Sequence, residues 1–108
     1  MTIHRFVQIG LGPLGVKMIK MAADRSSCQL VAAVDNHPDL VGKEVAQVTG
    51  TDHAGMLIRP SLEEVVASVR PDIAVITTVS DMQRITPLLL SVVRQGIPVV
   101  STCEELSY

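Results

Sequence analysis

A ten-residue stretch near the start of the chain, FVQIGLGPLG, limits the possible folds more than any other feature. An apolar run leads into Gly10, Gly12 and Gly15, and a segment with helical periodicity follows. Asp35 stands 20 positions after Gly15, at the end of a second apolar run. A strand, a G-x-G-x-x-G turn, a helix, a strand and an acid in this order are typical of a βαβ unit that binds a dinucleotide.

Each glycine has its own task in such a unit. Gly10 permits the tight turn, Gly12 lets a pyrophosphate approach the backbone because it has no Cβ, and Gly15 lets the helix pack close to the strand. Pro13 and Leu14 open the helix, where proline is tolerated. The unpaired N–H groups and partial positive charge of the helix N-terminus would face the phosphates. A plain βα turn is the alternative, since glycines also mark ordinary turns.

The rest of the chain alternates strand-like and helix-like segments. Apolar runs predict strands over 3–9, 29–35, 56–58, 73–79 and 97–102, and helical periodicity predicts helices over 13–25, 39–48, 61–70 and 82–95. This order predicts an α/β fold of Rossmann type, a doubly wound parallel sheet of about five strands with helices on both faces. We expect residues 1–108 to form one domain of this kind.

Individual residues refine the predicted helix ends. Ser61 and Glu64 fit a capping box at the start of the third helix. Pro87 falls inside the fourth predicted helix, so the regular part of that helix could begin there with Thr86 as its cap. Gly96 suits the position just after the same helix.

The composition argues against several classes of function. Aromatic residues make up 2% of the chain and the net charge is −2 without a basic run, which argues against a nucleic-acid partner. No run approaches the ~20 apolar residues of a membrane span, and the first residues lack the layout of a signal peptide. Two distant cysteines and three histidines without ligand spacing indicate neither a disulfide framework nor a metal site. A reducing cytoplasm is the simplest setting.

Asp35 is the first candidate binding residue. An acid at the tip of the second strand can accept hydrogen bonds from the adenosine ribose, and it repels a 2′-phosphate. Asn36 and His37 could contact the ribose or adenine. No arginine stands at 36–38 and Lys43 is the nearest cation, which favours NAD over NADP. The alternative is that Asp35 only begins an Asx-type turn.

Further candidates follow the fourth and fifth predicted strands. Thr77, Thr78 and Val79 lie at the carboxyl end of one, and Thr102 ends the other. Ligands of open α/β sheets bind at this edge, so we expect these residues near the nicotinamide and its ribose. The alternative is that threonine simply suits the end of a strand.

Several segments together resemble one known family, the amino-terminal NAD(P)-binding domain of dihydrodipicolinate reductase-like proteins. The segments are IGLGPLG, VAAVD, DIAVITTVSD and GIPVVSTCEELSY, and the nearest branch is 2,4-diaminopentanoate dehydrogenase. The resemblance implies a Rossmann domain followed by an α+β domain that binds substrate and drives oligomerisation. By resemblance, Gly10, Gly12 and Gly15 form the phosphate loop, Asp35 is the ribose acid, and Thr77 and Thr78 lie in the loop after the fourth strand.

Two departures bear on the substrate. Ser101-Thr102-Cys103-Glu104 stands where true dihydrodipicolinate reductases carry Gly-Thr-Thr-Gly, which puts that exact substrate in doubt. Glucose–fructose oxidoreductases, a second set of relatives, carry Glu-Lys-Pro after the same strand, and this chain lacks that lysine.

The sequence thus predicts the cofactor-binding domain of an NAD(P)-dependent oxidoreductase that acts on an amino acid or amine. We expect the substrate-binding and catalytic residues in a further domain absent from this chain, a homo-oligomeric assembly, and no turnover by the 108 residues alone. Glu104 and Glu105 are adjacent and would not face each other, so we expect no catalytic pair there. A non-catalytic nucleotide-sensing or regulatory module, or an interaction domain that has lost its ligand, are the alternatives.

Overall fold

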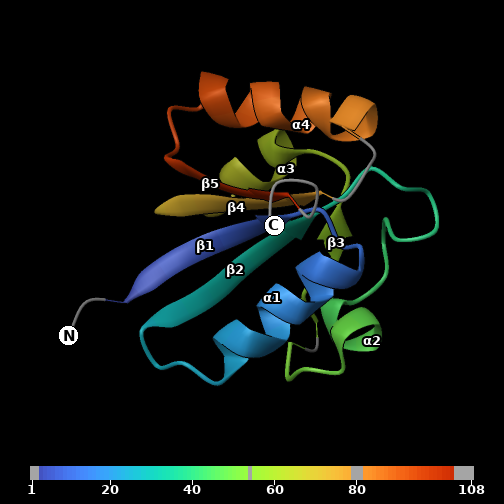
Figure 1. Cartoon of the computed structure of the whole chain (residues 1–108), viewed down its shortest axis with the longest axis vertical. Helices are drawn as coiled ribbons and strands as arrows, with labels where there is room; N and C mark the ends of the chain where they lie inside the picture. Colours follow the sequence, from blue (N-terminus) through green and yellow to red (C-terminus); the bar gives the residue numbers. More distant parts are fainter. Residues whose placement is uncertain (1–2, 54, 79–81, 104–108) are drawn as a thin grey trace.

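The computed structural model describes residues 3–53, 55–78 and 82–103. Strands and helices alternate along the chain, and the five strands form one parallel sheet in the order β3-β2-β1-β4-β5 (Figure 1). This confirms the predicted α/β Rossmann-type fold. The elements are β1 (His4–Ile9), α1 (Pro13–Ala23), β2 (Cys28–Val34), α2 (Val45–Thr49), β3 (Ile58–Arg59), α3 (Leu62–Val66), β4 (Ile73–Thr78), α4 (Met82–Arg94) and β5 (Val99–Cys103).

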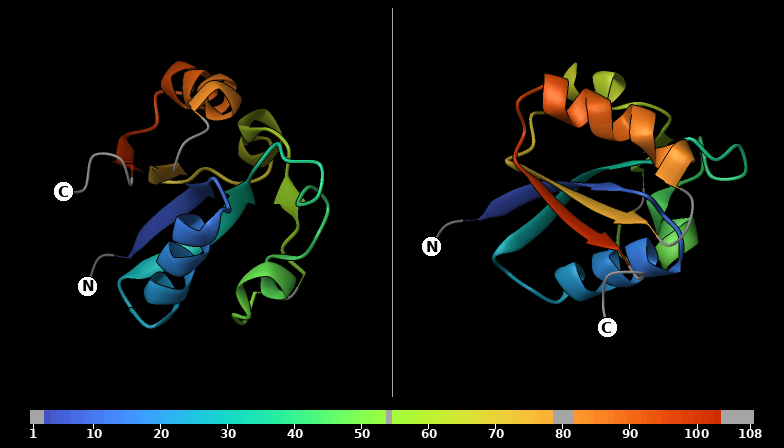
Figure 2. Two further views of the ribbon diagram at one scale, coloured as in Figure 1. Left: turned by 45° about the vertical axis from the view of Figure 1, so that its right-hand side comes forward. Right: turned by 45° about the horizontal axis from the view of Figure 1, so that its top comes forward.

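Helices cover both faces of the sheet. In Figure 1 and in both views of Figure 2, α1 and α2 lie on one side and α3 and α4 on the other. Successive residues of a strand point to opposite faces, so β1 contributes to two cores: Phe6 to one and Val7 to the other. The buried cluster on the α1 side comprises Phe6, Leu11, Ile19, Leu30, Ala33, Val45 and Ile58. The cluster on the α3 and α4 side comprises Val7, Ile9, Ala32, Val34, Leu62, Val65, Ala74, Ile76, Val92 and Ile97.

The strand order creates a switch point beside β1. The chain moves outward from β1 through β2 to β3, then crosses back to β4 and continues to β5. The connections after β1 and β4 therefore leave the same edge of the sheet toward opposite faces. Ligands of open α/β sheets bind in the crevice that such a reversal leaves. The glycine turn follows β1 directly, so the fold puts it at this switch point.

The second helix differs from the prediction. A helix was expected over 39–48, but α2 spans only Val45–Thr49. The N–H of Gly42 donates to the Ile58 carbonyl at 3.0 Å, and the Lys43 carbonyl accepts the N–H of Ile58 at 2.8 Å. Backbone groups that a helix would use thus pair with the edge of β3, because that pairing shields an otherwise open strand edge. Short-range periodicity carries no signal for this contact.

Of three predicted helix ends, the structure contradicts two and confirms one. The capping box is wrong: Ser61 occupies the N-cap of α3, but its hydroxyl lies 3.5 Å from Glu64 Oε2 and bonds to no backbone N–H. Pro87 lies inside α4 rather than at its start. Because proline has no backbone N–H, one hydrogen bond is missing from that helix. Gly96 follows α4 with φ +70°, as predicted. Within the described ranges, no helix is long and apolar enough to cross a bilayer.

Candidate functional site

The glycine turn is packed so tightly that two of its positions admit no side chain. Gly10 has φ +94°, and a Cβ there would lie 2.3 Å from the carbonyl oxygen of Thr77. A Cβ at Gly15 would lie 2.0 Å from the carbonyl oxygen of Gly10. Backbone occupies both spaces, so glycine is required for α1 to sit against the ends of β1 and β4.

Gly12 is different, because none of the described residues requires a glycine there. Its φ of −73° suits any residue, and a Cβ would meet no atom of the described residues within 4 Å. The space beside it is open, on the outer side of the turn. A glycine is explained here if something outside the chain approaches the backbone, as a pyrophosphate does in dinucleotide sites.

The turn also leaves backbone donors unused. The N–H of Gly10 donates to the Val34 carbonyl at 2.9 Å, the N–H of Leu11 donates to Asp35 Oδ2 at 2.8 Å, and Pro13 has no N–H. Because α1 begins at Pro13, its first N–H groups have no carbonyl one turn earlier to bond. The N–H groups without a partner in the described chain are those of Gly12, Leu14 and Gly15. Together with the helix dipole they form an anion-binding surface.

Asp35 is fully buried and lies against the glycine turn. Its Oδ2 accepts the N–H of Leu11 at 2.8 Å, and its Oδ1 accepts the N–H of His37 at 2.9 Å. The second bond is the Asx-type turn that was the alternative interpretation of this residue. Asp35 therefore braces the turn.

The residues after Asp35 form a compact, acidic turn. The His37 carbonyl accepts the N–H groups of Leu40 at 3.0 Å and Val41 at 3.1 Å, and its Nδ1 accepts the N–H of Asp39 at 3.1 Å. The His37 side chain is 46% exposed, so its ring is available beside the tip of β2. No arginine or lysine belongs to residues 36–41, but the exposed Arg59 of β3 lies beside the tip of β2, where its carbonyl accepts the N–H of Asp35 at 3.0 Å.

A buried side chain that sequence analysis missed lies beneath the turn. Gln8 is fully buried, and its Nε2 is 2.9 Å from Thr77 Oγ1 and 3.1 Å from the Gly10 carbonyl oxygen. Thr77 Oγ1 also donates to that carbonyl at 3.3 Å. The signal available in the sequence was a polar residue within an otherwise apolar strand, FVQIG. Thr77, 4% exposed, thus lies under the turn rather than on its surface.

The other predicted site residues that the structure describes lie at the same edge of the sheet. Thr77 is the register partner of Thr102 across β4 and β5, and Thr78 is the partner of Cys103. Asn36 is partly buried beside Asp35. Val79, Glu104 and Glu105 lie outside the described residues.

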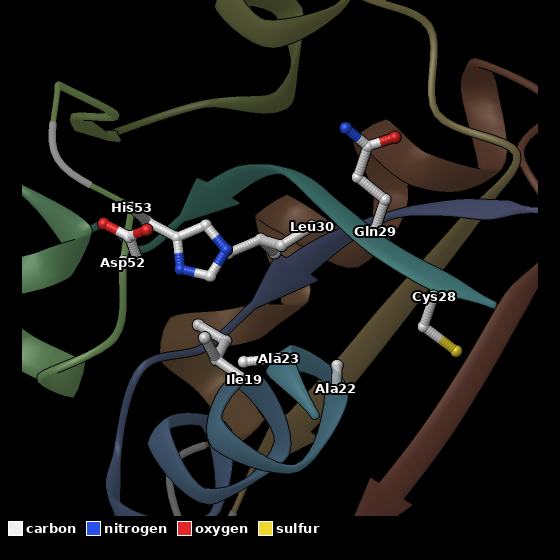
Figure 3. Close-up of a pocket in the computed structure, with 8 residues that line it drawn as sticks. All are labelled: Ile19, Ala22, Ala23, Cys28, Gln29, Leu30, Asp52 and His53. Carbon is white, nitrogen blue, oxygen red and sulfur yellow. The ribbon is translucent and has the colours of Figure 1, made fainter. Parts of the chain in front are cut away.

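A cavity of about 210 Å³ lies elsewhere, between α1, β2 and the segment after α2 (Figure 3). Its walls include Ile19, Leu30 and His53, and none of the glycines of the turn. The imidazole of His53 is bonded through Nδ1 to Thr51 Oγ1 at 2.6 Å. Among the described residues, no cluster of His, Cys, Asp or Glu is arranged to hold a metal. The cavity is separate from the switch-point site, because none of the glycines of the turn lines it.

Solved structures with the same arrangement include several dehydrogenases. Amine dehydrogenase from Mycobacterium smegmatis aligns with 91% of this chain and 29% of its own, at 26% identity and a TM-score of 0.76. The Rex-family repressor RSP aligns over 95% of this chain and 46% of its own, at 19% identity and a TM-score of 0.72. Aspartate semialdehyde dehydrogenase with NADP from Candida albicans aligns over 96% and 30%, at 14% identity and a TM-score of 0.74. The last two likenesses show the fold alone.

The chain spans less than a third of the two dehydrogenases and about half of the repressor. No match to it was found among curated proteins. A sequence family described as dihydrodipicolinate reductase, N-terminus, matches residues 5–103. That match covers the glycine turn, Asp35 and the ends of β4 and β5. The chain belongs to this dihydrodipicolinate reductase N-terminal family.

Proposed function

We propose that this chain binds NAD(H) or NADP(H) at the glycine turn, as the cofactor-binding part of an oxidoreductase. One observation carries the proposal: open space beside Gly12 adjoins the unused N–H groups of Gly12, Leu14 and Gly15. A pyrophosphate fits this combination, since it is an anion that needs donors and close access to backbone. Membership of the dihydrodipicolinate reductase N-terminal family and the NADP complex of the Candida albicans enzyme give support.

The rest of the cofactor would extend in both directions from the turn. The adenosine ribose would meet the tip of β2 at Asp35, with Asn36 and His37 beside it. The nicotinamide would lie over the carboxyl ends of β4 and β5, near Thr78 and Thr102. Hydride transfer is the chemistry of the cofactor, and this chain's part is to bind and orient it.

We propose NAD rather than NADP as the preferred cofactor. If the adenosine ribose meets Asp35, a 2′-phosphate would come close to the Asp35 carboxylate, and the turn after this residue carries Asp39 but no arginine or lysine. A carboxylate and a phosphate that lie close together repel each other, whereas a ribose hydroxyl donates a hydrogen bond to a carboxylate.

The proposed substrate is an amino acid or an amine, and the proposed branch is that of 2,4-diaminopentanoate dehydrogenase. The likeness to the amine dehydrogenase, at 26% identity, supports this choice over other dehydrogenases. Because the chain spans 29% of that protein, the substrate would be bound by a further domain, and homo-oligomerisation would also depend on that domain.

A nucleotide-sensing module is the second candidate. It is favoured by the likeness to the Rex-family repressor, which was also solved with β-NADH. A sensor must bind one redox state of the nucleotide more tightly than the other, because only differential affinity shifts an equilibrium. A cofactor domain needs no such difference.

Calorimetric titration of the purified chain with NADH, NADPH and NAD⁺ tests these proposals. Binding of NADH that exceeds binding of NADPH supports the cofactor assignment and its preference. A dissociation constant for NADH about 100-fold below that for NAD⁺, equivalent to about 2.7 kcal/mol, would favour the sensor. No binding of any dinucleotide would overturn the proposal, and turnover by the chain alone would contradict a catalytic role for another domain.

A further inference from the structure

Gln8 is an unusual residue for its place in the fold. Four residues of β1 are buried, and three of them are apolar. Gln8, the fourth, is fully buried on the α1 side of the sheet between its register partners Ala33 and Val75. Burying an amide is unfavourable unless its hydrogen bonds are replaced.

The contacts of Gln8 do not amount to a good stabilising network. Its Nε2 donates to Thr77 Oγ1 and to the Gly10 carbonyl, but its Oε1 has no partner in the described chain. A half-satisfied buried amide contributes little to stability, and an apolar side chain of equal length would pack as well. Stability alone therefore does not explain glutamine here.

The bonds of Gln8 do fix the orientation of one peptide unit. The carbonyl of Gly10 and the N–H of Leu11 belong to the same planar peptide and point in opposite directions. Gln8 Nε2 and Thr77 Oγ1 hold the carbonyl inward, at 3.1 and 3.3 Å. Asp35 Oδ2 holds the N–H from the other side, at 2.8 Å. The Gly10–Leu11 peptide is thus clamped at both ends.

The orientation of this peptide matters because the next residues face the proposed phosphate site. If the peptide flipped, the carbonyl oxygen of Gly10 would leave its two donors and face the buried Asp35 carboxylate that now accepts the Leu11 N–H. The two oxygens would repel each other and the turn would rearrange, so the N–H groups of Gly12 and Leu14 would no longer be presented to a pyrophosphate.

We infer that Gln8 is a positioning residue for the dinucleotide: by holding the Gly10–Leu11 peptide in place, it keeps the N–H groups of Gly12 and Leu14 facing the pyrophosphate. The inference rests on the proposed function. It is a role in binding rather than in catalysis, because Gln8 is buried and touches the ligand only through the turn. Its effect should be confined to ligands that carry the diphosphate.

The test compares Gln8→Met with Thr49→Val in the whole chain. Methionine matches the length of glutamine and removes the amide. Thr49→Val also removes side-chain hydrogen bonds of a buried residue, the 2.9 Å bond to the Val45 carbonyl and the bonds to the hydroxyl and N–H of Thr51, but in α2 and away from the turn. Affinities for NADH, ADP-ribose and adenosine are measured by NMR titration, below the unfolding temperature of every variant. Hydrogen exchange of the Leu11 amide reports the peptide clamp directly.

Gln8→Met is expected to weaken NADH and ADP-ribose about tenfold, the effect of roughly one buried hydrogen bond, and to leave adenosine unchanged. Exchange of the Leu11 amide should accelerate in the same variant. Thr49→Val should change neither. If Gln8→Met does not fold, Thr77→Val and Thr77→Ser replace it. The serine variant should bind NADH more tightly than the valine variant does, because serine keeps the hydroxyl.

Four results would overturn the inference. Unchanged NADH affinity in Gln8→Met would remove the positioning role while leaving the proposed function intact. Equal losses for adenosine and NADH, or equal losses in Thr49→Val, would show a general effect on folding. Failure of the unmodified chain to bind any dinucleotide would overturn the proposed function and this inference with it.

Discussion

Asp35 Oδ2 accepts the backbone N–H of Leu11 at 2.8 Å, so the acid at the tip of β2 is bonded to the glycine turn after β1. The two residues are 24 positions apart, and the parallel pairing of β1 with β2 brings them together. Spacing alone points to a ribose contact for this acid. The structure adds a second task, which makes the geometry of the phosphate site depend on the residue proposed to select the cofactor.

Asp35→Asn should therefore lower both stability and selectivity. An amide cannot accept from both N–H groups with both of its heavy atoms, so one buried donor loses its partner, at about 1–3 kcal/mol. Thermal unfolding should shift downward by about 4–8 °C for each kcal/mol. The affinity for NADH should fall and the ratio of NADH to NADPH affinity should narrow, because the charge that repels the 2′-phosphate is gone.

The matched control is Asp39→Asn, which removes a charge from the same turn at a side chain that is 87% exposed. Its unfolding temperature and its cofactor ratio should stay close to those of the unmodified chain. If Asp39→Asn narrows the ratio as much as Asp35→Asn does, the preference comes from overall charge rather than from Asp35.

Gly12→Ala and Gly15→Ala should separate binding from folding. Alanine at 12 would meet no described atom within 4 Å, has a permitted φ and lowers the entropy of the unfolded chain, so stability should be unchanged or rise by about 0.4–1 kcal/mol. The affinity for NADH should nevertheless drop, because the methyl group stands where the pyrophosphate must approach. At 15 the added Cβ would lie 2.0 Å from the Gly10 carbonyl oxygen, which should destabilise the chain by about 3 kcal/mol or more.

Thermal unfolding and calorimetric titration of both variants check this pair. Normal NADH binding by Gly12→Ala would mean that no ligand approaches the turn at that position. A fully stable Gly15→Ala would mean that α1 can move away from the turn, contrary to the close packing of the structure.

The alternation of elements and the glycine turn could be predicted because their signals are local. Buried strands appear as short apolar runs, and the φ of +94° at Gly10 needs the residue type that stands there. Even the placement of Thr77 and Thr102 at one edge follows from parallel pairing, which sets carboxyl ends side by side.

The remaining features depend on contacts that no local pattern encodes. Gln8 and Thr77 are 69 positions apart, and nothing in either segment announces the other. The start of α2 is delayed because Gly42 and Lys43 bond to Ile58, a tertiary contact that overrides helical periodicity. The burial of Asp35 could not be predicted either, since an acid at a strand end is exposed unless neighbouring backbone supplies donors.

Ser91→Ala should reduce stability without touching the site. Ser91 Oγ donates to Glu63 Oε1 at 2.9 Å, which ties α4 to α3 on the face away from the glycine turn. Loss of this bond should cost about 1 kcal/mol and lower the unfolding temperature by about 4–8 °C. NADH affinity, measured by titration below that temperature, should be unchanged.

Ser68→Ala serves as the comparison for Ser91→Ala. Among the residues that the structure describes, its hydroxyl bonds to the Val65 carbonyl alone, at 3.3 Å and within the same short stretch of chain. A local bond that joins no two elements should matter less, so this variant should unfold closer to the unmodified chain. A larger loss for Ser68→Ala would contradict the importance of the α3–α4 link.

His37→Arg should shift the cofactor preference toward NADP. The His37 side chain is half exposed beside Asp35, and the bond that Asp35 accepts from residue 37 comes from the backbone, so substitution leaves that bond intact. A guanidinium there could bind a 2′-phosphate in bidentate fashion and offset the charge of Asp35. NADPH affinity should rise about tenfold, or about 1.4 kcal/mol, while NADH affinity changes little.

The titrations are carried out at 0.15 M salt, where the field of a distant charge is screened over about 8 Å and only a direct contact persists. His37→Gln, which changes the ring without adding charge, should leave the ratio of NADH to NADPH affinity unchanged. An equal rise for NADH and NADPH in His37→Arg would point to general attraction of the diphosphate, and would remove residue 37 from the ribose end of the site.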